Sequence, residues 1–287
     1  MSEPNRSHDR TNRWFRRRTR RTSTSSGFSI YDPVLFGIDE DGRRVEVTLI
    51  YRNLLIGGEP GAGKSSLLNT VIARAALCSD CQLWLFDGKR VELGLWRKVA
   101  QVFVGNDITY ALDRLRALQA EMDARYAQLD AALRRKIDRI DGLPVILCAI
   151  DELAYFSVTI GTPQEQDEFK TLVRDLVARG RAAGIIMIVA TQRPSADIIP
   201  TSLRDLFGYR VAFRCTTDSS SDIILSVGWA SEGFSAKSIP PDDAYRGVGF
   251  LLAEGGMPRR FKAAYLDDDQ IDDVIAHALR IRHRPAG

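Results

Sequence analysis

Residues 52–66 read RNLLIGGEPGAGKSS, in which an apolar run leads into a glycine-rich turn. Leu54 to Ile56 are typical of a buried strand, and apolar residues recur at helical spacing from Ser65 to Leu77. Between these elements, the spacing GxxxxGK(S/T) lets backbone N–H groups of the turn face phosphate oxygens, while the helix adds its positive N-terminal end. The stretch therefore predicts a strand, a phosphate-binding loop and a helix.

The same turn carries the polar side chains that a nucleoside triphosphate requires. We expect Lys64 to reach the β- and γ-phosphates and Ser65 to bind Mg²⁺ through its hydroxyl. A glycine-rich turn could match this pattern by chance, but a strand and a helix flank it and a second motif follows. ATP and Mg²⁺ are thus the predicted cofactors. The predicted nucleotide-binding residues are Gly58, Glu59, Pro60, Gly61, Ala62, Gly63, Lys64, Ser65 and Ser66.

A second apolar run, Val145 to Ile150, ends in the acidic pair Asp151-Glu152. A continuous apolar run of this length is typical of a parallel strand covered on both faces. At the carboxyl end of such a strand, Asp151 can hold Mg²⁺ and Glu152 can orient or deprotonate the attacking water. An acidic pair also suits a helix N-terminus. The catalytic interpretation therefore depends on the phosphate-binding loop that precedes it.

A third apolar run, residues 185–190, precedes the sequence TQRP at 191–194. A polar side chain at the end of a strand next to the phosphate-binding loop can sense the γ-phosphate or position water, so Gln192 is the candidate. Its alternative role is that of a capping or turn residue before Pro194.

The order of these elements predicts an α/β fold. Strands alternate with helices, including a long amphipathic helix over residues 108–136, so we expect a doubly wound, mostly parallel sheet with helices on both faces. The triphosphate then binds at the carboxyl ends of the strands. The chain has 287 residues, of which 45% are hydrophobic and 27% charged, enough for one domain with a sizeable core.

Together the three motifs resemble those of the FtsK/SpoIIIE family of DNA-translocating ATPases, within the wider FtsK–HerA group. The resemblance spans about Pro33 to Leu279, and RAAG followed by ATQRP is its most specific part. The other family-like segments, in chain order, are Asp87-Gly-Lys89 with Glu92-Leu93, Glu121-Met-Asp-Ala-Arg125-Tyr126, Arg181-Ala-Ala-Gly184, Arg210-Val-Ala-Phe213, Gly247-Val-Gly-Phe250 and Asp267-Asp-Asp269.

The resemblance implies a RecA-like P-loop motor domain that assembles as a hexameric ring around double-stranded DNA. In such a ring an arginine of the neighbouring subunit completes the catalytic site. Arg181 is the first candidate and Arg210 the second, although either could be a structural ion-pair partner. The predicted DNA-contacting pore loops are residues 155–162 and 229–240, the latter with Lys237. Because few residues follow Leu279, we do not expect the family's winged-helix module within this chain.

The leading functional hypothesis is an ATP-driven translocase of double-stranded DNA, in conjugative transfer or in chromosome or plasmid partitioning. The chain resembles the compact transfer proteins of actinobacterial conjugative and integrative elements. One alternative is a type VII-like protein-secretion ATPase. Another is a regulatory or binding P-loop module that binds a nucleotide but does not hydrolyse it. The intact set Lys64, Ser65, Asp151, Glu152 and Gln192 argues against the last.

Charge divides the chain into three expected parts: a basic disordered tail at 1–26, a short β-hairpin at 27–51 and the motor domain at 52–287. Residues 1–21 contain eight arginines against Glu3 and Asp9, a net charge of +6, which leaves −3 for the rest of a +3 chain. The tail could bind DNA phosphates, bind anionic lipid with Trp14 and Phe15 as anchors, or have no ligand. These three alternatives stay open.

No apolar run approaches the roughly 18 residues of a membrane span, and the sequence leads us to expect no signal peptide. We therefore expect a cytoplasmic protein, or one peripheral at the membrane through membrane-embedded partner proteins. Four cysteines, at positions 78, 81, 148 and 215, are expected to be structural thiols, because the CxxC pair has no second pair beside it.

Overall fold

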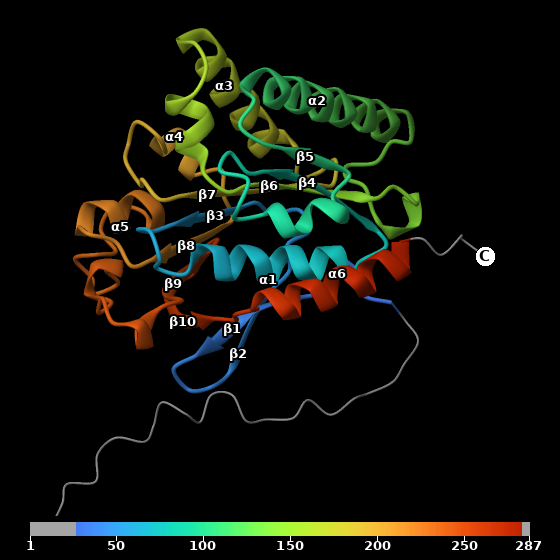
Figure 1. Ribbon diagram of the computed structural model, residues 1–287. Coiled ribbons are helices and arrows are strands. Elements are labelled where there is room, and N and C mark those ends of the chain that lie inside the picture. The colour runs from blue at the N-terminus through green and yellow to red at the C-terminus, as the bar shows by residue number, and fades with distance from the viewer. Residues whose placement is uncertain (1–26, 283–287) are drawn as a thin grey trace, which may run out of the picture.

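A ten-stranded sheet runs through residues 27–282, the part of the protein that the computed structural model describes (Figure 1). Helices cover both faces, so the predicted α/β fold with a mostly parallel sheet is confirmed. The strands are β1 (Val34–Asp39), β2 (Arg44–Val47), β3 (Leu54–Gly57), β4 (Cys81–Phe86), β5 (Val102–Val104), β6 (Val145–Ile150), β7 (Ile185–Thr191), β8 (Tyr209–Phe213), β9 (Val248–Ala253) and β10 (Arg259–Ala263). The α-helices are α1 (Lys64–Ala76), α2 (Ile108–Ala131), α3 (Pro163–Arg179), α4 (Thr201–Arg204), α5 (Asp218–Leu225) and α6 (Asp268–Arg282).

The strands lie in the order β2-β1-β10-β9-β8-β3-β7-β6-β4-β5. From β8 to β5 all neighbours pair in parallel, and β3, β6 and β7 are buried along their whole length. Parallel strands with apolar layers on both faces are built from continuous apolar runs, as the sequence predicted for these three. Because β7 lies between β3 and β6, the three motifs that follow these strands meet at one edge of the sheet.

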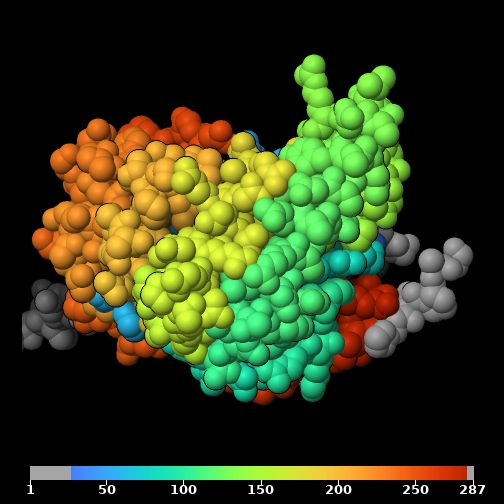
Figure 2. Space-filling view, turned by 90° about the horizontal axis from the view of Figure 1, so that it is seen from above, coloured from blue at the N-terminus to red at the C-terminus, as the bar shows by residue number. Residues whose placement is uncertain are grey.

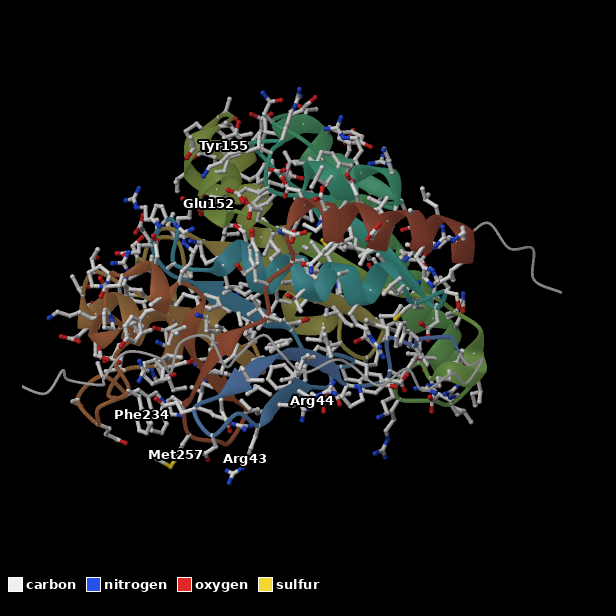
Figure 3. The ribbon with its side chains drawn as sticks, turned by 60° about the horizontal axis from the view of Figure 1, so that its bottom comes forward. Arg43, Arg44, Glu152, Tyr155, Phe234 and Met257 are labelled. Carbon is white, nitrogen blue, oxygen red and sulfur yellow. The ribbon has the colours of Figure 1, made fainter. Side chains whose placement is uncertain are left out.

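Four antiparallel strands extend the sheet beyond β8, with the β1–β2 hairpin joined to it through β10. Asp39 shapes the hairpin turn, because its Oδ1 accepts the N–H of Arg43 at 2.7 Å and its carboxylate pairs with Arg259 of β10. Figure 3 shows Arg43 and Met257 at this end of the sheet, on the other side of the molecule from Glu152. The predicted basic tail, residues 1–26, lies outside the described residues.

The helices form one layer on each face of the sheet. α1 packs against α6 on one face, and α2 packs against α3 on the other (Figure 1). Each layer closes its own apolar core, the first with α1 and α6, the second with α2, α3 and α5. Figure 2 looks onto the second layer, where α2 and α3 cover the sheet and the segment after α2 projects at one corner.

Side chains of the EMDARY segment fasten α2 to the turn between α3 and β7. The Arg125 side chain is only 2% exposed, and it donates to Glu121 Oε1 at 2.8 Å and to the Ala183 carbonyl at 3.0 Å. A buried guanidinium needs such partners, because an unpaired buried charge costs several kcal/mol. The contact therefore fixes the turn that carries Arg181.

Candidate functional site

The chain between β3 and α1 folds as a loop whose backbone requires glycine. Gly58, Gly61 and Gly63 have φ values of 150°, 74° and 119°, which residues with a Cβ rarely adopt. A Cβ on Gly63 would lie 2.4 Å from the Gly247 Cα, and one on Gly58 would lie 2.9 Å from the Phe213 Cβ. The loop thus lies tightly against the β8–β9 side of the sheet.

Lys64, the first residue of α1, reaches back into this loop. Its Nζ donates to the carbonyl oxygens of Gly58 and Glu59, both at 2.8 Å, and the residue is 6% exposed. Burial lowers the pKa of Lys64 to about 8, although carboxylates led by Glu152 act in the opposite direction. An ammonium held on two loop carbonyls is poised to exchange them for phosphate oxygens.

Strand register aligns the ends of the three motifs. Gly57 of β3 pairs with Thr191 of β7, and Ile150 of β6 pairs with Val189 of β7. Two residues further along both strands, Glu152 therefore lies level with Thr191, in the same row as the start of the phosphate-binding loop. Gly57 and Thr191 are more than a hundred positions apart in the sequence, and the parallel pairing of β3 with β7 brings them together.

Glu152 is held by donors from the end of β7. Its Oε1 accepts the Thr191 hydroxyl at 2.7 Å and the Ala154 N–H at 3.2 Å, while its Oε2 accepts the Gln192 N–H at 2.7 Å. The Gln192 side chain points elsewhere and accepts a 3.4 Å hydrogen bond from Lys89. The structure thus brings Glu152 and Gln192 together. Their partners Thr191 and Lys89, although both stand in quoted motifs, were not predicted as site residues.

Asp151 lies next to this network but is not part of it. The residue is 5% exposed, and within residues 27–282 its buried Oδ2 has no hydrogen-bond partner. Burial raises the pKa of Asp151 to about 7, and the nearby carboxylates of Glu92, Asp87 and Glu152 act in the same direction. A cation beside Asp151 would compensate both the missing hydrogen-bond partner and the repulsion from the nearby carboxylates.

The residues predicted to hold Mg²⁺, Ser65 and Asp151, suit that ion. Mg²⁺ takes oxygen ligands and is usually held by one or two carboxylates together with substrate phosphates and water. A buried carboxylate oxygen without a partner and a hydroxyl on the phosphate-binding loop are ligands of this kind. Across residues 27–282 no group of three or more His, Cys, Asp or Glu side chains is arranged to hold a metal ion. Phosphates and water would have to supply the remaining ligands.

The outer side of the loop faces a pocket that the sequence did not predict. Glu59 donates its N–H to the Arg214 carbonyl at 2.9 Å, and its carboxylate forms an ion pair with the Arg214 side chain. Arg214 follows β8, whose place beside β3 could not be inferred from local sequence. The pocket next to it is lined by Pro60 from the loop and by Pro241 and Tyr245 from the segment before β9.

The two arginines proposed to act between subunits lie away from the phosphate-binding loop. Arg181 is in the turn before β7, at the amino end of the strand, whereas Lys64 lies at the carboxyl ends. It is half-exposed and lines a pocket with Arg52 and other basic residues. Arg210 is engaged inside its own subunit, where it donates to Ser226 Oγ at 2.7 Å and pairs with Asp205 at 3.7 Å.

The first segment predicted as an irregular pore loop is more ordered than expected. Residues 155–159 form a π-helix, so the prediction of an irregular segment is wrong there. Phe156 is fully buried and stacks on Phe169, and the Tyr155 ring closes over Gly88 in the loop after β4. Figure 3 shows Tyr155 beside Glu152 on the same side of the molecule. π-helical turns are frequent at functional sites, and this one follows the acidic pair directly.

The remaining sequence expectations concern thiols and membranes. The four cysteines are buried and free, and burial raises the pKa of the Cys78 and Cys215 thiols to about 12. Their thiolates are therefore scarce at neutral pH, which suits structural roles. Among the helices formed by residues 27–282, none has the length and apolar character needed to cross a membrane.

Solved structures of other proteins have a similar fold. The conjugation coupling protein TcpA of pCW3, solved in its monomer form with ATPγS, superposes with a TM-score of 0.76, 24% identity and coverage of 88% of this chain and 71% of that one. The cytoplasmic domain of the type VII secretion ATPase EccC of Thermomonospora curvata gives a TM-score of 0.72, 22% identity and coverage of 91% and 32%. The chain therefore has the RecA-like α/β fold that these two structures share.

Sequence comparison narrows the class to a family. Residues 15–143 match the model of the FtsK/SpoIIIE family. The DNA translocase FtsK of Treponema pallidum is 31% identical over 274 residues, covering 90% of this chain, and the DNA translocase SftA of Bacillus subtilis is 29% identical over 257 residues, covering 84%. The chain contains an FtsK/SpoIIIE-family domain. It spans about a third of the first of these relatives and about a quarter of the second, 32% and 26% of their lengths.

Proposed function

We propose that this chain is an ATP-hydrolysing, Mg²⁺-dependent motor that moves double-stranded DNA. One observation carries the proposal: the buried carboxylate of Glu152 is held by Thr191 and Gln192 at the end of β7, the strand next to the phosphate-binding loop. A module that only binds a triphosphate needs the loop alone. A hydrolase also needs an oriented base beside it.

Each residue of the site has a role in this proposal. Lys64 exchanges the carbonyls of Gly58 and Glu59 for β- and γ-phosphate oxygens. Ser65 and Asp151 would hold Mg²⁺, which would neutralise charge on the phosphates. The backbone N–H groups of residues 58–66 surround the phosphates. Glu152 accepts a proton from the attacking water, and the Gln192 amide positions that water or senses the γ-phosphate.

The site is completed by a second subunit in a ring, which we take to be hexameric. Arg181 acts on the triphosphate of the neighbouring subunit, where a guanidinium stabilises the transferred charge. This choice rests on its half-exposed position at the sheet edge opposite the loop, from which it cannot reach the triphosphate of its own subunit. Arg210 is the weaker candidate because Ser226 and Asp205 already engage it.

DNA is the proposed polymer because the curated relatives are named DNA translocases. Within that function, conjugative transfer is favoured over partitioning by the likeness to a conjugation coupling protein. Residues 229–240 and the arginine-rich tail would contact phosphates. Lys237 in the first of these segments is paired with Asp218 at 3.2 Å, so DNA would have to compete for it. We expect the protein in the cytoplasm, recruited to the membrane by membrane-embedded partner proteins.

Protein secretion is the second candidate, favoured by one observation. The EccC domain, described as a type VII secretion ATPase, matches 91% of this chain in structure. A motor of this fold that moves an extended polypeptide would keep the same nucleotide site and differ in what its pore contacts.

The deciding experiment measures ATP hydrolysis by the purified chain with linear duplex DNA, with single-stranded DNA and with a secretion-signal peptide. The Lys64→Ala variant provides the background rate. Stimulation by duplex DNA supports the proposal, whereas stimulation by the peptide alone would replace DNA by protein as the cargo. ATP binding without hydrolysis under every condition would overturn the proposed motor function.

A further inference from the structure

Ser65, the proposed Mg²⁺ ligand on the phosphate-binding loop, is bonded to a carboxylate from another part of the sheet. Its hydroxyl donates to Glu92 Oε2 at 2.8 Å. Ser65 lies in the first turn of α1, and Glu92 lies in the loop after β4; both side chains are half-buried. The contact therefore joins the triphosphate site to a segment that is not part of the loop.

The backbone around Glu92 is fixed by the buried carboxylate of Asp87. Asp87 is fully buried at the end of β4; its Oδ1 accepts the N–H groups of Lys89 at 3.1 Å and Arg90 at 2.8 Å, and its Oδ2 accepts that of Leu93 at 2.8 Å. Leu93 is itself buried at 1% exposure. Glu92, immediately before it, is thus presented to Ser65 by a loop that is folded around a single carboxylate.

A serine that binds a cation does so through oxygen lone pairs, so its hydroxyl hydrogen must point to an acceptor elsewhere. Glu92 is such an acceptor in this structure. We propose that Glu92 is a positioning residue of the Mg²⁺ site, which directs the lone pairs of Ser65 toward the cation. This inference rests on the proposed function, since it concerns the same site.

Two observations support a metal role over a purely structural one. Asp151 keeps a buried Oδ2 without a partner in the described residues, which is a free ligand position in the same site. Among the charged groups that act on Asp151, Glu92 is the strongest. Partners of metal ligands typically change metal affinity by about 10- to 100-fold when they are removed.

A purely structural role of Glu92 predicts a different result. A carboxylate near the first turn of α1 is favourable with the positive end of the helix, whatever its effect on Ser65. In that case removal of Glu92 lowers the melting temperature but leaves metal affinity unchanged, because the helix interaction involves neither the cation nor the hydroxyl.

The test measures Mn²⁺ affinity by electron paramagnetic resonance on the full chain with ATPγS, and nucleotide affinity in EDTA. We expect Glu92→Ala to weaken Mn²⁺ binding by about 10- to 100-fold and to leave nucleotide affinity in EDTA within about twofold of the wild type. Glu92→Gln keeps an acceptor for Ser65 and should recover part of the loss. Because Glu92 acts through Ser65, adding Glu92→Ala to Ser65→Ala should cost little more than Ser65→Ala alone.

The matched control is Glu168→Ala, which removes a glutamate from an exposed ion pair with Arg116. It should change none of these affinities. Unchanged Mn²⁺ affinity in Glu92→Ala, or losses that simply add in the double variant, would overturn the positioning role. Equal losses with and without metal would show that Glu92 only supports packing. A wild-type chain that binds no nucleotide in either condition would instead refute the proposed function, together with the role built on it.

Discussion

The Thr191 hydroxyl donates a 2.7 Å hydrogen bond to Glu152 Oε1 inside the sheet, where Thr191 has no exposed surface. The bond links the ends of β6 and β7, two strands that pair in parallel. The next residue, Gln192, donates its N–H to the other carboxylate oxygen at 2.7 Å. The end of β7 therefore sets the orientation of the proposed base and carries the residue proposed to sense the γ-phosphate.

Removing this hydroxyl should separate catalysis from nucleotide binding. Thr191→Val keeps the volume but leaves Glu152 Oε1 with a weaker set of donors, so the carboxylate loses its fixed direction. We expect kcat for ATP to fall about tenfold, a part of the 10²- to 10⁴-fold that a general base contributes, with KM nearly unchanged. The loss of a hydrogen bond to a charged acceptor should also cost roughly 1.5–3 kcal/mol of stability.

Thr191→Ser is the control, because it restores the donor without the methyl group. It should recover most of kcat. Wild-type turnover in Thr191→Val would show that the bond is only structural, and a large rise in KM would place its effect on binding instead.

A second prediction concerns the base itself. Glu152→Gln keeps the size of the side chain but cannot accept a proton from water, so kcat should fall by about 10²- to 10⁴-fold while ATP stays bound. Retention of radiolabelled ATP on a filter measures nucleotide binding, and the amount of ADP found by chromatography measures hydrolysis. Turnover at the wild-type rate would remove Glu152 from the mechanism.

The site could be predicted from the sequence to the extent that it lies at the ends of fully buried strands. β3, β6 and β7 are continuous apolar runs, so the phosphate-binding loop before Lys64, the pair Asp151-Glu152 and Gln192 could each be assigned to the end of a strand. Parallel pairing then brings such ends to one edge. The partner of Ser65 could not be inferred, because Glu92 approaches only through the fold of the loop after β4 around Asp87.

The ends of the helices and strands depend on features that the spacing of apolar residues in the sequence does not show. The helix expected over residues 108–136 ends at Ala131, because Leu133 adopts a left-handed φ of 52°. The segment after Glu152 forms a π-helix, since Phe156 must reach the core while Tyr155 covers Gly88. The attachment of the β1–β2 hairpin to β10 depends on residues more than two hundred positions apart. Strand pairing between residues so far apart leaves no periodic signal in the sequence.

The raised pKa of Asp151 predicts a pH dependence of stability. The folded-state pKa of about 7 exceeds the ordinary value of 3.8, so between these pH values the folded protein binds more protons than the unfolded chain. Stability without metal should therefore decrease as pH rises from about 4 to about 7, by an amount on the order of a few kcal/mol, since one pKa unit corresponds to about 1.36 kcal/mol.

Asp151→Asn isolates this contribution because it cannot ionise. In EDTA its melting temperature should exceed that of the wild type at pH 8 and approach it at pH 5, as measured by differential scanning calorimetry. All other titrating groups are common to both proteins. A variant less stable than the wild type at pH 8 would show that the charged carboxylate is compensated within the subunit. With Mg²⁺ and ATPγS the order should reverse, because only the wild type gains the metal contact.

The last prediction tests whether a site is shared between subunits. Arg181 lies at the amino end of β7, whereas Lys64 begins α1 after the loop at the carboxyl end of β3. Arg181→Ala should therefore leave ATP binding intact and reduce DNA-stimulated hydrolysis by about 10³-fold or more, the range found for arginines that act in trans. Arg210→Ala should mainly lower stability, because Arg210 bonds to Ser226 and pairs with Asp205.

Mixing two inactive variants distinguishes action in trans from damage to the fold. Lys64→Ala subunits cannot hold the triphosphate but supply Arg181, and Arg181→Ala subunits hold it but lack the arginine. If Arg181 reaches the neighbouring site, mixed assemblies contain junctions with both intact residues, and hydrolysis should reappear and peak near equal proportions. Activity that stays at background in every mixture, although the variants co-assemble by size-exclusion chromatography, would mean that Arg181 serves its own subunit, where it stabilises the turn packed on Arg125.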